Sequence, residues 1–171
     1  YFKNTNDINS LQEVFDDDFT IYHKPSLVEI DGVSFSMIPW INKENYEETV
    51  EFMKNNSSSV LCGHLELNGY QVLQGVRFEN GMDDDILKKY ETVLSGHFHF
   101  KQSRDNVHYL GTQYQITFSD LNVPKGFHVF DTSDRSLEFI ENPRKIFYSL
   151  EYDDENNTPE EILSKDFSKY A

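Results

Sequence analysis

The chain has 171 residues, the length of a single domain, and its 15 Lys and Arg against 30 Asp and Glu give a formal net charge of −15. Such an acidic surface is not built as a whole to neutralise nucleic-acid phosphates, although it leaves room for a local site in which metal ions supply the positive charge. Hydrophobic residues at 37% and aromatic residues at 15% exclude a disordered chain and are sufficient for a packed core.

The first part of the chain is predicted to contain a short helix and then three strands. Leu11, Val14 and Phe15 share one face of a helical turn or two. Runs of β-branched and aromatic residues predict strands at Thr20–Tyr22, Leu27–Ile30 and Val33–Ile38. Asp31-Gly32 separates the last two strands and is typical of a type I′ turn, whose central residues need positive φ, so a β-hairpin is expected there.

The middle of the chain alternates predicted helices with short apolar strands. Glu44–Asn56 has apolar residues at helical spacing, and Asp83–Tyr90 begins with three aspartates and has two lysines near its end, as helices often do. An apolar strand precedes the second helix at Ser57–Gly63, and another follows it at Thr92–Gly96. Further strands are predicted at Val107–Leu110, Gln115–Phe118, Phe127–Asp131, Leu137–Ile140 and Ile146–Tyr152.

A five-residue phrase occurs twice, each time at the end of a predicted strand. Val60–His64 reads Val-Leu-Cys-Gly-His, and Val93–His97 reads Val-Leu-Ser-Gly-His and continues with Phe98 and His99. Because the helix predicted between the two copies makes their strands parallel neighbours, both Gly-His ends should lie at one edge of the sheet. That edge, the carboxyl end of parallel strands, is where α/β sheets bind ligands.

The spacing of the histidines favours a metal site. Alternate residues of an extended chain share a face, so the Cα atoms of His97 and His99 lie about 6.6 Å apart, a spacing that can bracket two metal ions about 3.5–4 Å apart. Neutral imidazole is a common ligand of Zn, Mn and Fe ions. With His64, three histidines would also suit a mononuclear zinc site, whereas a dinuclear site needs bridging carboxylates as well. Without a metal, His64 and His97 would be buried histidines that donate to backbone carbonyls.

These phrases resemble the last two motifs of the calcineurin-like metallophosphoesterases. More narrowly, several phrases resemble the nuclease subunit of the recombination exonuclease of T-even-type phages, which is related to the cellular double-strand-break-repair nucleases. The matching phrases are Ile38-Pro39-Trp40, Gly63–Gly69, Gly96–His99, Tyr109–Thr112, Lys125–Phe127 and Phe130–Thr132. The resemblance covers nearly the whole chain and keeps the order of the motifs.

The resemblance implies a ligand set and a fold. His64 and His97 would hold one divalent metal ion and His99 a second, with Mn²⁺ the usual activator, and the two ions would clamp a scissile phosphate and generate the attacking hydroxide. The implied fold is α/β, half of a two-sheet sandwich flanked by helices. Residues 1–152 would form the C-terminal half of the metallophosphoesterase domain, and residues 153–171 an acidic linker toward a capping domain.

The first three motifs of the resembled family do not occur in the 171 residues. Those motifs, Asp-x-His, Gly-Asp and Gly-Asn-His, supply the family's bridging Asp, its Asn ligand and its transition-state His. The transition-state His is therefore expected upstream of Tyr1, and no substrate-binding residue is assigned. We expect the chain to be the second half of a phosphoesterase domain and, by itself, inactive or nearly so.

The other chemically reactive side chains are interpreted as structural. His108 and His128 are expected on a sheet face rather than at a metal. Cys62 lies inside an apolar strand and matches Ser95 in the repeated phrase, so it is expected to be a small buried residue and not a nucleophile. Trp40 could stack on a nucleobase, but an aromatic core residue at a strand end is the preferred interpretation.

Three functions remain open at this point. The first is part of a DNA exonuclease or endonuclease of phage recombination and repair, for which the resemblance implies DNA, an ATPase of the structural-maintenance-of-chromosomes type and a second copy of the chain as partners. The others are a metallophosphoesterase of another substrate class and a non-catalytic binding or scaffold fragment. Without an apolar run of the ~20 residues that span a membrane, and with a single cysteine, the chain is expected in the cytoplasm, that of an infected bacterium if it derives from a phage.

Overall fold

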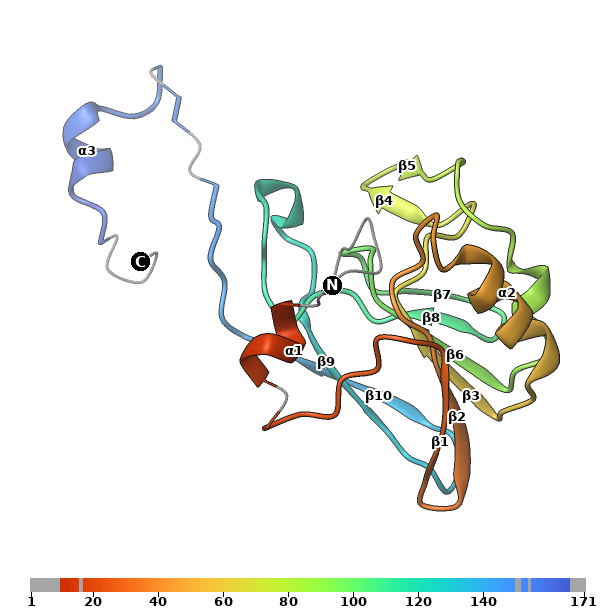
Figure 1. The fold of residues 1–171 in the computed structure, drawn as a ribbon. Coiled ribbons are helices and arrows are strands. Elements are labelled where there is room, and N and C mark those ends of the chain that lie inside the picture. Colours follow the sequence, from red (N-terminus) through yellow and green to blue (C-terminus); the bar gives the residue numbers. More distant parts are fainter. Residues whose placement is uncertain (1–9, 16, 150–151, 154, 167–171) are drawn as a thin grey trace.

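The computed structural model describes residues 10–15, 17–149, 152–153 and 155–166. Its centre is a six-stranded mixed sheet (Figure 1). In spatial order the strands are β1 (Ser26–Ile30), β2 (Val33–Met37), β3 (Val60–Gly63), β6 (Thr92–Ser95), β8 (Val107–Tyr109) and β7 (Gln102–Arg104). Strands β2, β3, β6 and β8 pair in parallel, and β1 and β7 pair antiparallel at the two edges.

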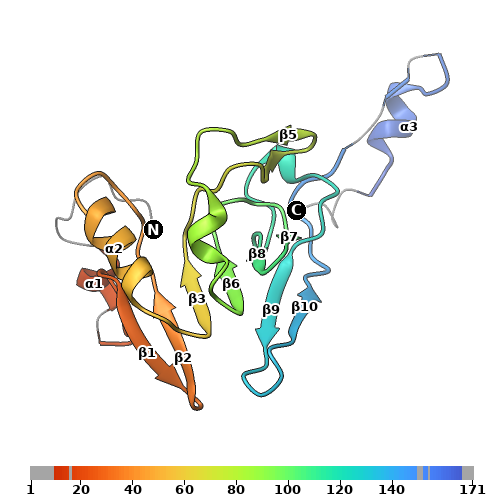
Figure 2. The same cartoon turned by 90° about the vertical axis from the view of Figure 1, so that its right-hand side faces the viewer.

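In the part of the chain that the structure describes, two small antiparallel sheets and a few helices accompany the main sheet (Figure 2). The small sheets are the pair β4 (Gln71–Leu73) and β5 (Val76–Arg77) and the pair β9 (Gly126–Phe130) and β10 (Leu137–Glu141). The α-helices are α1 (Ser10–Phe15), α2 (Tyr46–Asn55) and α3 (Pro159–Leu163). Two 3₁₀-helices occur as well, η1 (Asp84–Leu87) and η2 (Phe118–Asp120).

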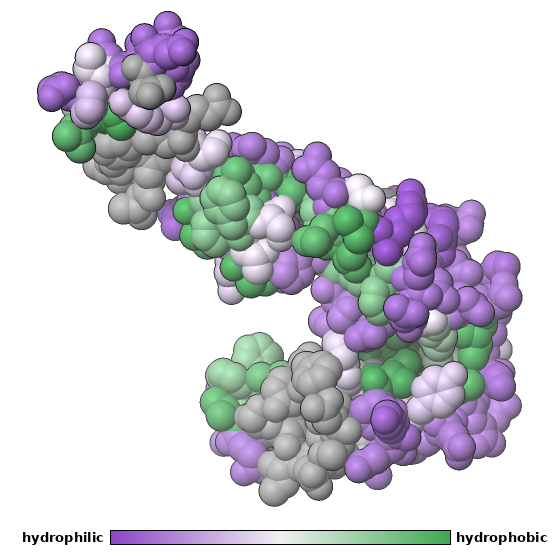
Figure 3. Space-filling view, turned by 90° about the horizontal axis from the view of Figure 1, so that it is seen from above, coloured by the Kyte–Doolittle hydropathy of each residue, from purple (hydrophilic) through white to green (hydrophobic). Residues whose placement is uncertain are grey.

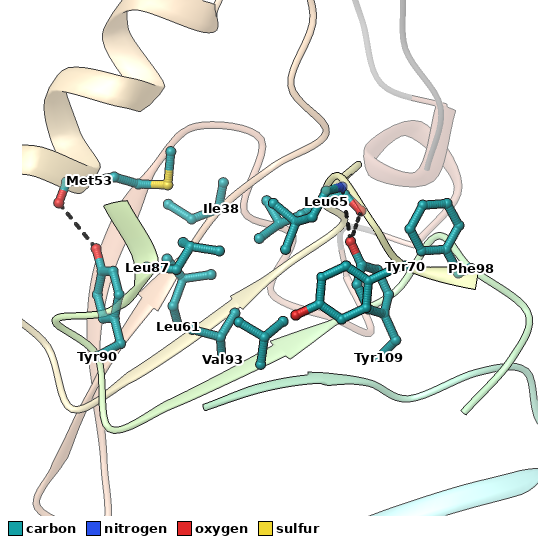
Figure 4. Close-up of a cluster of buried hydrophobic side chains, with 12 residues drawn as sticks. Ile38, Met53, Leu61, Leu65, Tyr70, Leu87, Tyr90, Val93, Phe98 and Tyr109 are labelled. Carbon is teal, nitrogen blue, oxygen red and sulfur yellow. Dashed lines mark hydrogen bonds between the residues drawn. The ribbon is translucent and has the colours of Figure 1, made fainter. Parts of the chain in front are cut away.

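One core lies between the main sheet and the helices α2 and η1 (Figure 4). Met53 of α2 and Leu87 of η1 pack there against Leu61 of β3 and Val93 of β6, and all four side chains are fully buried. This contact explains the apolar residues of the predicted helix 44–56, because its buried face is the one turned to the sheet.

A second core lies on the opposite face of the sheet, where the β9–β10 hairpin packs. Phe35 of β2 and Val60 of β3 are buried on this face, and the ring of Phe130 from β9 meets that of Phe35 edge-on at 6.2 Å. The neighbouring residues of β3, Val60 and Leu61, therefore face opposite cores. Strands buried on both faces have continuous rather than alternating apolar sequences, as the two repeated phrases do.

Several predictions about the backbone are confirmed. Asp31 and Gly32 both have positive φ, 51° and 75°, and close the hairpin between β1 and β2. Strands β3 and β6 are parallel neighbours. The α/β class is also confirmed, with a mixed six-stranded sheet and few helices, an arrangement consistent with half of a two-sheet sandwich.

Three predicted strands are wrong, since residues 20–22 and 115–118 and the described residues of 146–152 form no strand. Side chains take the place of a strand partner in the second and third. The carboxylate of Asp120 accepts the N–H groups of Ile116 and Thr117 at 2.9 and 3.0 Å, and the amide oxygen of Gln115 accepts those of residues 146 and 147 at 2.8 and 2.7 Å. These hydrogen bonds depend on long-range packing, which strand propensity does not report.

The helix predicted at Asp83–Tyr90 is in fact the single 3₁₀ turn η1. The side chain of Asn106 satisfies backbone carbonyls at and after the end of this turn. Its amide donates to the carbonyls of Leu87 and Tyr90 at 2.9 and 2.7 Å. Strands β4, β5 and β7 were not predicted, and each has no more than three residues. The crossover still returns the chain in parallel, so the predicted neighbourhood of the two Gly-His phrases does not depend on a full helix.

Beyond β10 the chain runs away from the sheets toward α3 (Figures 1 and 2). The division into a domain over 1–152 and a linker over 153–171 stays a prediction. Hydrophilic residues cover much of the face seen in Figure 3, in keeping with the net charge of −15. Among the described residues no helix is both long and apolar enough to cross a membrane.

Candidate metal centre

The two Gly-His phrases meet at the carboxyl ends of β3 and β6, as predicted. Gly63 lies opposite Ser95 in the parallel register, and the N–H of Gly96 donates to the carbonyl of Gly63 at 3.0 Å. The imidazole rings of His64 and His97 follow directly, with ring centroids 5.3 Å apart and planes nearly perpendicular at 85°. Residues that are far apart in the sequence therefore form one side-chain pair at the sheet edge.

The backbone around this pair is unusual in two ways. A Cβ on Gly96 would lie 2.7 Å from Nδ1 of His64, so only glycine lets the ring lie against the second strand. His97 has a φ of 90°, in the left-handed region that side-chain-bearing residues rarely adopt. Such a conformation costs on the order of 1–3 kcal/mol and is concentrated at functional sites, so it marks His97 as more than a packing residue.

Trp40 covers both imidazoles. Its ring lies 4.9 Å from that of His64 and 5.3 Å from that of His97, and its carbonyl accepts the side-chain amide of Asn45 at 2.9 Å. The interpretation of Trp40 as an aromatic core residue is wrong, because β2 ends at Met37 and Trp40 is half-buried and belongs to neither core. Its ring instead contacts the two candidate ligands. Histidines held by an indole ring have few rotamers open to them, which favours a preorganised site.

The loop after His64 is tied to the neighbouring strands by buried hydroxyls. The N–H of Leu65 donates to Oγ of Ser95 at 3.0 Å. The hydroxyl of Tyr109, from β8, donates to the carbonyl of Leu65 at 2.8 Å and accepts the N–H of Leu67 at 3.1 Å (Figure 4). Tyr109 is almost completely buried, so water does not compete for these hydrogen bonds, which hold the chain beside His64.

Burial favours the neutral form of both imidazoles. It lowers the pKa of His64 below its usual value, and the neighbouring His97 adds to that effect. Burial also lowers the pKa of His97, although Glu66, whose Oε1 lies 3.6 Å from Nε2 of His97, opposes the shift. Neutral imidazole is the form that binds a metal ion. Burial raises the pKa of Cys62 to about 11, so the thiol stays protonated and does not act as a nucleophile at neutral pH.

His99 has a different environment from the other two candidate ligands. Its Nδ1 lies 3.4 Å from Oδ2 of the buried Asp120, and its carbonyl accepts the ammonium of Lys125 at 2.8 Å. Within the part of the chain that the structure describes, no three His, Cys, Asp or Glu side chains are placed to share one metal ion. The structure therefore joins His64 and His97 but does not assemble the three predicted ligands into a complete site.

The geometry of the pair fits two ligands of a single ion. Two imidazoles bound through nitrogens at about 2.1 Å to a tetrahedral ion have ring centres about 5 Å apart, and the rings of His64 and His97 are 5.3 Å apart. Burial favours the neutral form of both rings, and Trp40 contacts both. The remaining donors of a complete ligand set would have to come from elsewhere.

Two cavities adjoin the pair and share His64 and Trp40 in their walls. One has a volume of about 350 Å³ and extends past Cys62 toward Asn45. The other, of about 290 Å³, is also lined by Glu66. A group bound at His64 would thus be accessible from either cavity.

His108 and His128 lie away from this pair. Nδ1 of His108 is 2.9 Å from the hydroxyl of Ser103, and the ring of His128 packs on that of Phe139 at 5.0 Å. Both line a cavity of about 540 Å³ between the β7–β8 edge and the β9–β10 hairpin. His108 lies in β8 and His128 in β9, so both are strand residues, as expected from the sequence.

Sequence reasoning assigned no role to several residues that surround the candidate ligands: Glu66, Ser95, Tyr109, Asp120 and Lys125. Ser95 lies in the repeated phrase, and Glu66, Tyr109 and Lys125 lie in phrases that carry the family resemblance, so the sequence marks their segments but not their contacts. Asp120 lies just beyond a segment predicted as a strand and carries no local signal, because only the folded chain brings it to His99.

Comparison with known proteins places these features in a family context. No family model matches the chain. Exonuclease subunit 1 of Enterobacteria phage T4 is 38% identical over 157 residues, covering 87% of this chain and 46% of the phage protein. A subunit of the nuclease SbcCD from Staphylococcus epidermidis is 25% identical, covering 84% of this chain and 46% of that protein, and its counterpart from Staphylococcus saprophyticus is 22% identical, covering 84% and 36%. The chain thus spans less than half the length of each of these relatives.

Proposed function

Because the chain belongs to the family of the phage exonuclease subunit 1 and the related subunit of the SbcCD nucleases, we propose that it forms part of the metal-dependent phosphodiesterase centre of a DNA nuclease. The observation that carries this proposal is the contact of His64 with His97 at the carboxyl ends of two parallel strands. A close pair of neutral imidazoles at a ligand-binding sheet edge is what metal coordination requires.

In this proposal His64 and His97 bind one divalent ion and His99 binds a second, and Mn²⁺ is the metal we expect. Two such ions, when bound, act as Lewis acids on the phosphate and activate a water molecule for in-line attack. The chain's own part is to hold His64 and His97 deprotonated and oriented beneath Trp40. We further propose that the main sheet and the β9–β10 hairpin form half of a calcineurin-like sandwich.

The chain alone is proposed to be inactive or nearly so. Its sequence has no Asp-x-His, Gly-Asp or Gly-Asn-His motif, and the resembled family uses these motifs for the bridging carboxylate, the Asn ligand and the transition-state His. A dinuclear centre without a bridging carboxylate would be incomplete. The histidine pair is therefore proposed to act together with polypeptide that carries those motifs.

The proposed partners follow from the relatives. The T4 protein is named as subunit 1 of an exonuclease and the staphylococcal proteins as a subunit of the nuclease SbcCD, so each is a component of a larger assembly. We propose DNA as substrate, an ATPase of the structural-maintenance-of-chromosomes type as partner subunit, a homodimer of the nuclease, and action in the bacterial cytoplasm. A partner with basic surface would compensate for the net charge of −15.

The test uses the full-length nuclease that contains this chain, with Mn²⁺-dependent release of nucleotides from DNA as the readout. His64→Ala and His99→Ala should each lower the rate by more than about 100-fold, since loss of a ligand should exceed the 10–100-fold typical of outer-shell partners. His108→Ala is the matched control and should retain activity. Mn²⁺-dependent nuclease activity that survives both ligand substitutions would refute the proposal.

A second candidate is a phosphodiesterase of another substrate class, which the acidic composition favours. Assaying the same protein on DNA and on a small chromogenic phosphodiester separates the two candidates. A phosphodiesterase of another substrate class should hydrolyse the small ester and leave DNA intact, whereas a DNA nuclease should degrade DNA. A full-length protein without either activity would instead indicate a binding or scaffold role.

A further inference from the structure

A buried ion pair lies next to His99 and outside the pair formed by the two Gly-His phrases. Nζ of Lys125 lies 2.8 Å from Oδ1 of Asp120, and the two side chains are 3% and 0% exposed. Burying two charges is costly because both lose their hydration. Their mutual attraction offsets that cost only when the geometry is good and further hydrogen bonds satisfy the two groups. The partners of this pair therefore show what it stabilises.

Asp120 is held by hydrogen bonds from its own loop. Its Oδ2 accepts the N–H groups of Ile116 and Thr117 at 2.9 and 3.0 Å, and its carbonyl accepts the side-chain amide of Gln115 at 3.1 Å. Its Oδ1 accepts the ammonium of Lys125 at 2.8 Å, so every one of these partners is a donor suited to an ionised carboxylate. The carboxylate is thus charged and fixed in position.

The ion pair reaches His99 at two points. The ammonium of Lys125 donates to the carbonyl of His99 at 2.8 Å, and Oδ2 of Asp120 lies 3.4 Å from Nδ1 of the ring. The backbone of Gly111 presses against the same segment, since a Cβ there would lie 3.1 Å from the carbonyl oxygen of His99. Main chain and ring of His99 are therefore both in contact with buried, immobile groups.

We propose that Asp120 and Lys125 are positioning residues for His99, with Lys125 anchoring its backbone and Asp120 keeping the ring proton on Nδ1 so that Nε2 is the nitrogen offered to a metal ion. The identity of His99 as a ligand rests on the proposed function. A carboxylate beside the non-ligating nitrogen of a metal-binding His fixes the tautomer and raises the basicity of the other nitrogen.

Packing alone is a weaker explanation of the pair. A buried ion pair can often be replaced by apolar side chains of similar size without loss of stability. Retention of two charges here fits a requirement for their directed contacts with His99, which apolar side chains would not supply. The proposal therefore predicts that replacing both charges leaves the fold largely intact and changes the state of the His99 ring.

The first measurement is the tautomer of His99 in the metal-free chain, read from the ¹⁵N shifts of its imidazole in an NMR spectrum with long-range ¹H couplings. His99→Gln identifies the signals by their loss. The proposal expects the proton on Nδ1 and a free Nε2. A His99 that carries its proton on Nε2 overturns the proposal, whatever the variants show.

The second measurement compares two double variants. Asp120→Asn with Lys125→Met removes both buried charges, and His99 should then lose its fixed tautomer and populate the Nε2-protonated form. Asp84→Asn with Arg104→Met removes a more exposed ion pair of 2.6 Å and serves as the matched control, for which no change at His99 is expected. A His99 tautomer that is unchanged in the first double variant overturns the proposal.

The third measurement adds Mn²⁺, whose paramagnetism broadens the signals of nearby histidines. In the first double variant, the Mn²⁺ concentration needed to broaden His99 should rise about 10–100-fold, while His64 and His97 respond as in the unchanged chain. An equal rise at all three histidines would mean a general loss of structure and would overturn the positioning role. If Mn²⁺ broadens none of the three histidines in the unchanged chain, the chain does not hold the ion without the missing motifs, and the tautomer measurement decides the role of Asp120 and Lys125.

Discussion

Gly96→Ala tests whether the second strand end shapes the position of His64. The added Cβ would lie 2.7 Å from Nδ1 of His64, whereas ordinary contacts begin at 3.4 Å, so the ring must withdraw by about 0.7 Å. Trp40 and His97 pack against the same ring and oppose that movement. Ligand distances are held within about 0.2 Å in metal sites, so the displaced ring should no longer share an ion with His97.

The expected loss of stability for Gly96→Ala is about 1–3 kcal/mol from overpacking, reduced by the ~0.4–1 kcal/mol that the more restricted unfolded chain returns. Imidazole ¹H–¹⁵N NMR spectra of the metal-free chain should show the shifts of His64 and His97 displaced, and urea denaturation measures the stability. Gly63→Ala is the control, because its Cβ meets Leu65 and Ile38 at 3.2 and 3.3 Å and no imidazole. If both variants move the His64 signals equally, the proposed contact does not control the ring.

Tyr109→Phe leaves a buried carbonyl and a buried N–H without their hydroxyl partner, and urea denaturation should show a loss of about 2–4 kcal/mol. Tyr90→Phe, whose hydroxyl donates to the backbone carbonyl of Met53, should cost about 1–2 kcal/mol, and equal losses would contradict the double role of the Tyr109 hydroxyl. Met53→Ala empties a fully buried position between α2 and the sheet and should cost about 2–5 kcal/mol in the same assay, and a cost below about 1 kcal/mol would contradict that packing. Burial lowers the pKa of four histidines: His64, His97, His108 and His128. Because these groups take up protons more readily in the unfolded chain, stability present above pH 6.5 should be lost as the pH falls toward about 5, and a urea midpoint that stays constant or rises over that window would contradict it.

The predictions that succeeded depend on short-range physics. Asp31-Gly32 closes a hairpin because its backbone tolerates positive φ, and this property belongs to the residues themselves. The repeated apolar phrases became parallel strands because they can be buried on both faces. The prediction that His64 and His97 meet needed only that parallel pairing and the place of each histidine within two residues of the end of its strand.

The predictions that failed concern segments whose backbone partners are side chains from elsewhere. The segment 115–118 has the composition of a strand, yet Asp120 takes its N–H groups, and Gln115 takes those of residues 146 and 147. Strand propensity measures the fit of a side chain to a pleated surface and does not show whether a neighbouring strand is present. The same long-range hydrogen bonds bring Asp120 beside His99.

The amino-acid sequence by itself determined the class of the fold, the hairpin at Asp31-Gly32 and the edge of the sheet at which the two Gly-His phrases end, because turn chemistry and apolar patterning act within a few residues. Only the tertiary structure decided that Trp40 lies over both imidazoles and that the Asp120–Lys125 pair reaches His99. Those contacts join segments far apart in the chain, and their partners are selected by how the sheet, helices and loops pack rather than by any local pattern.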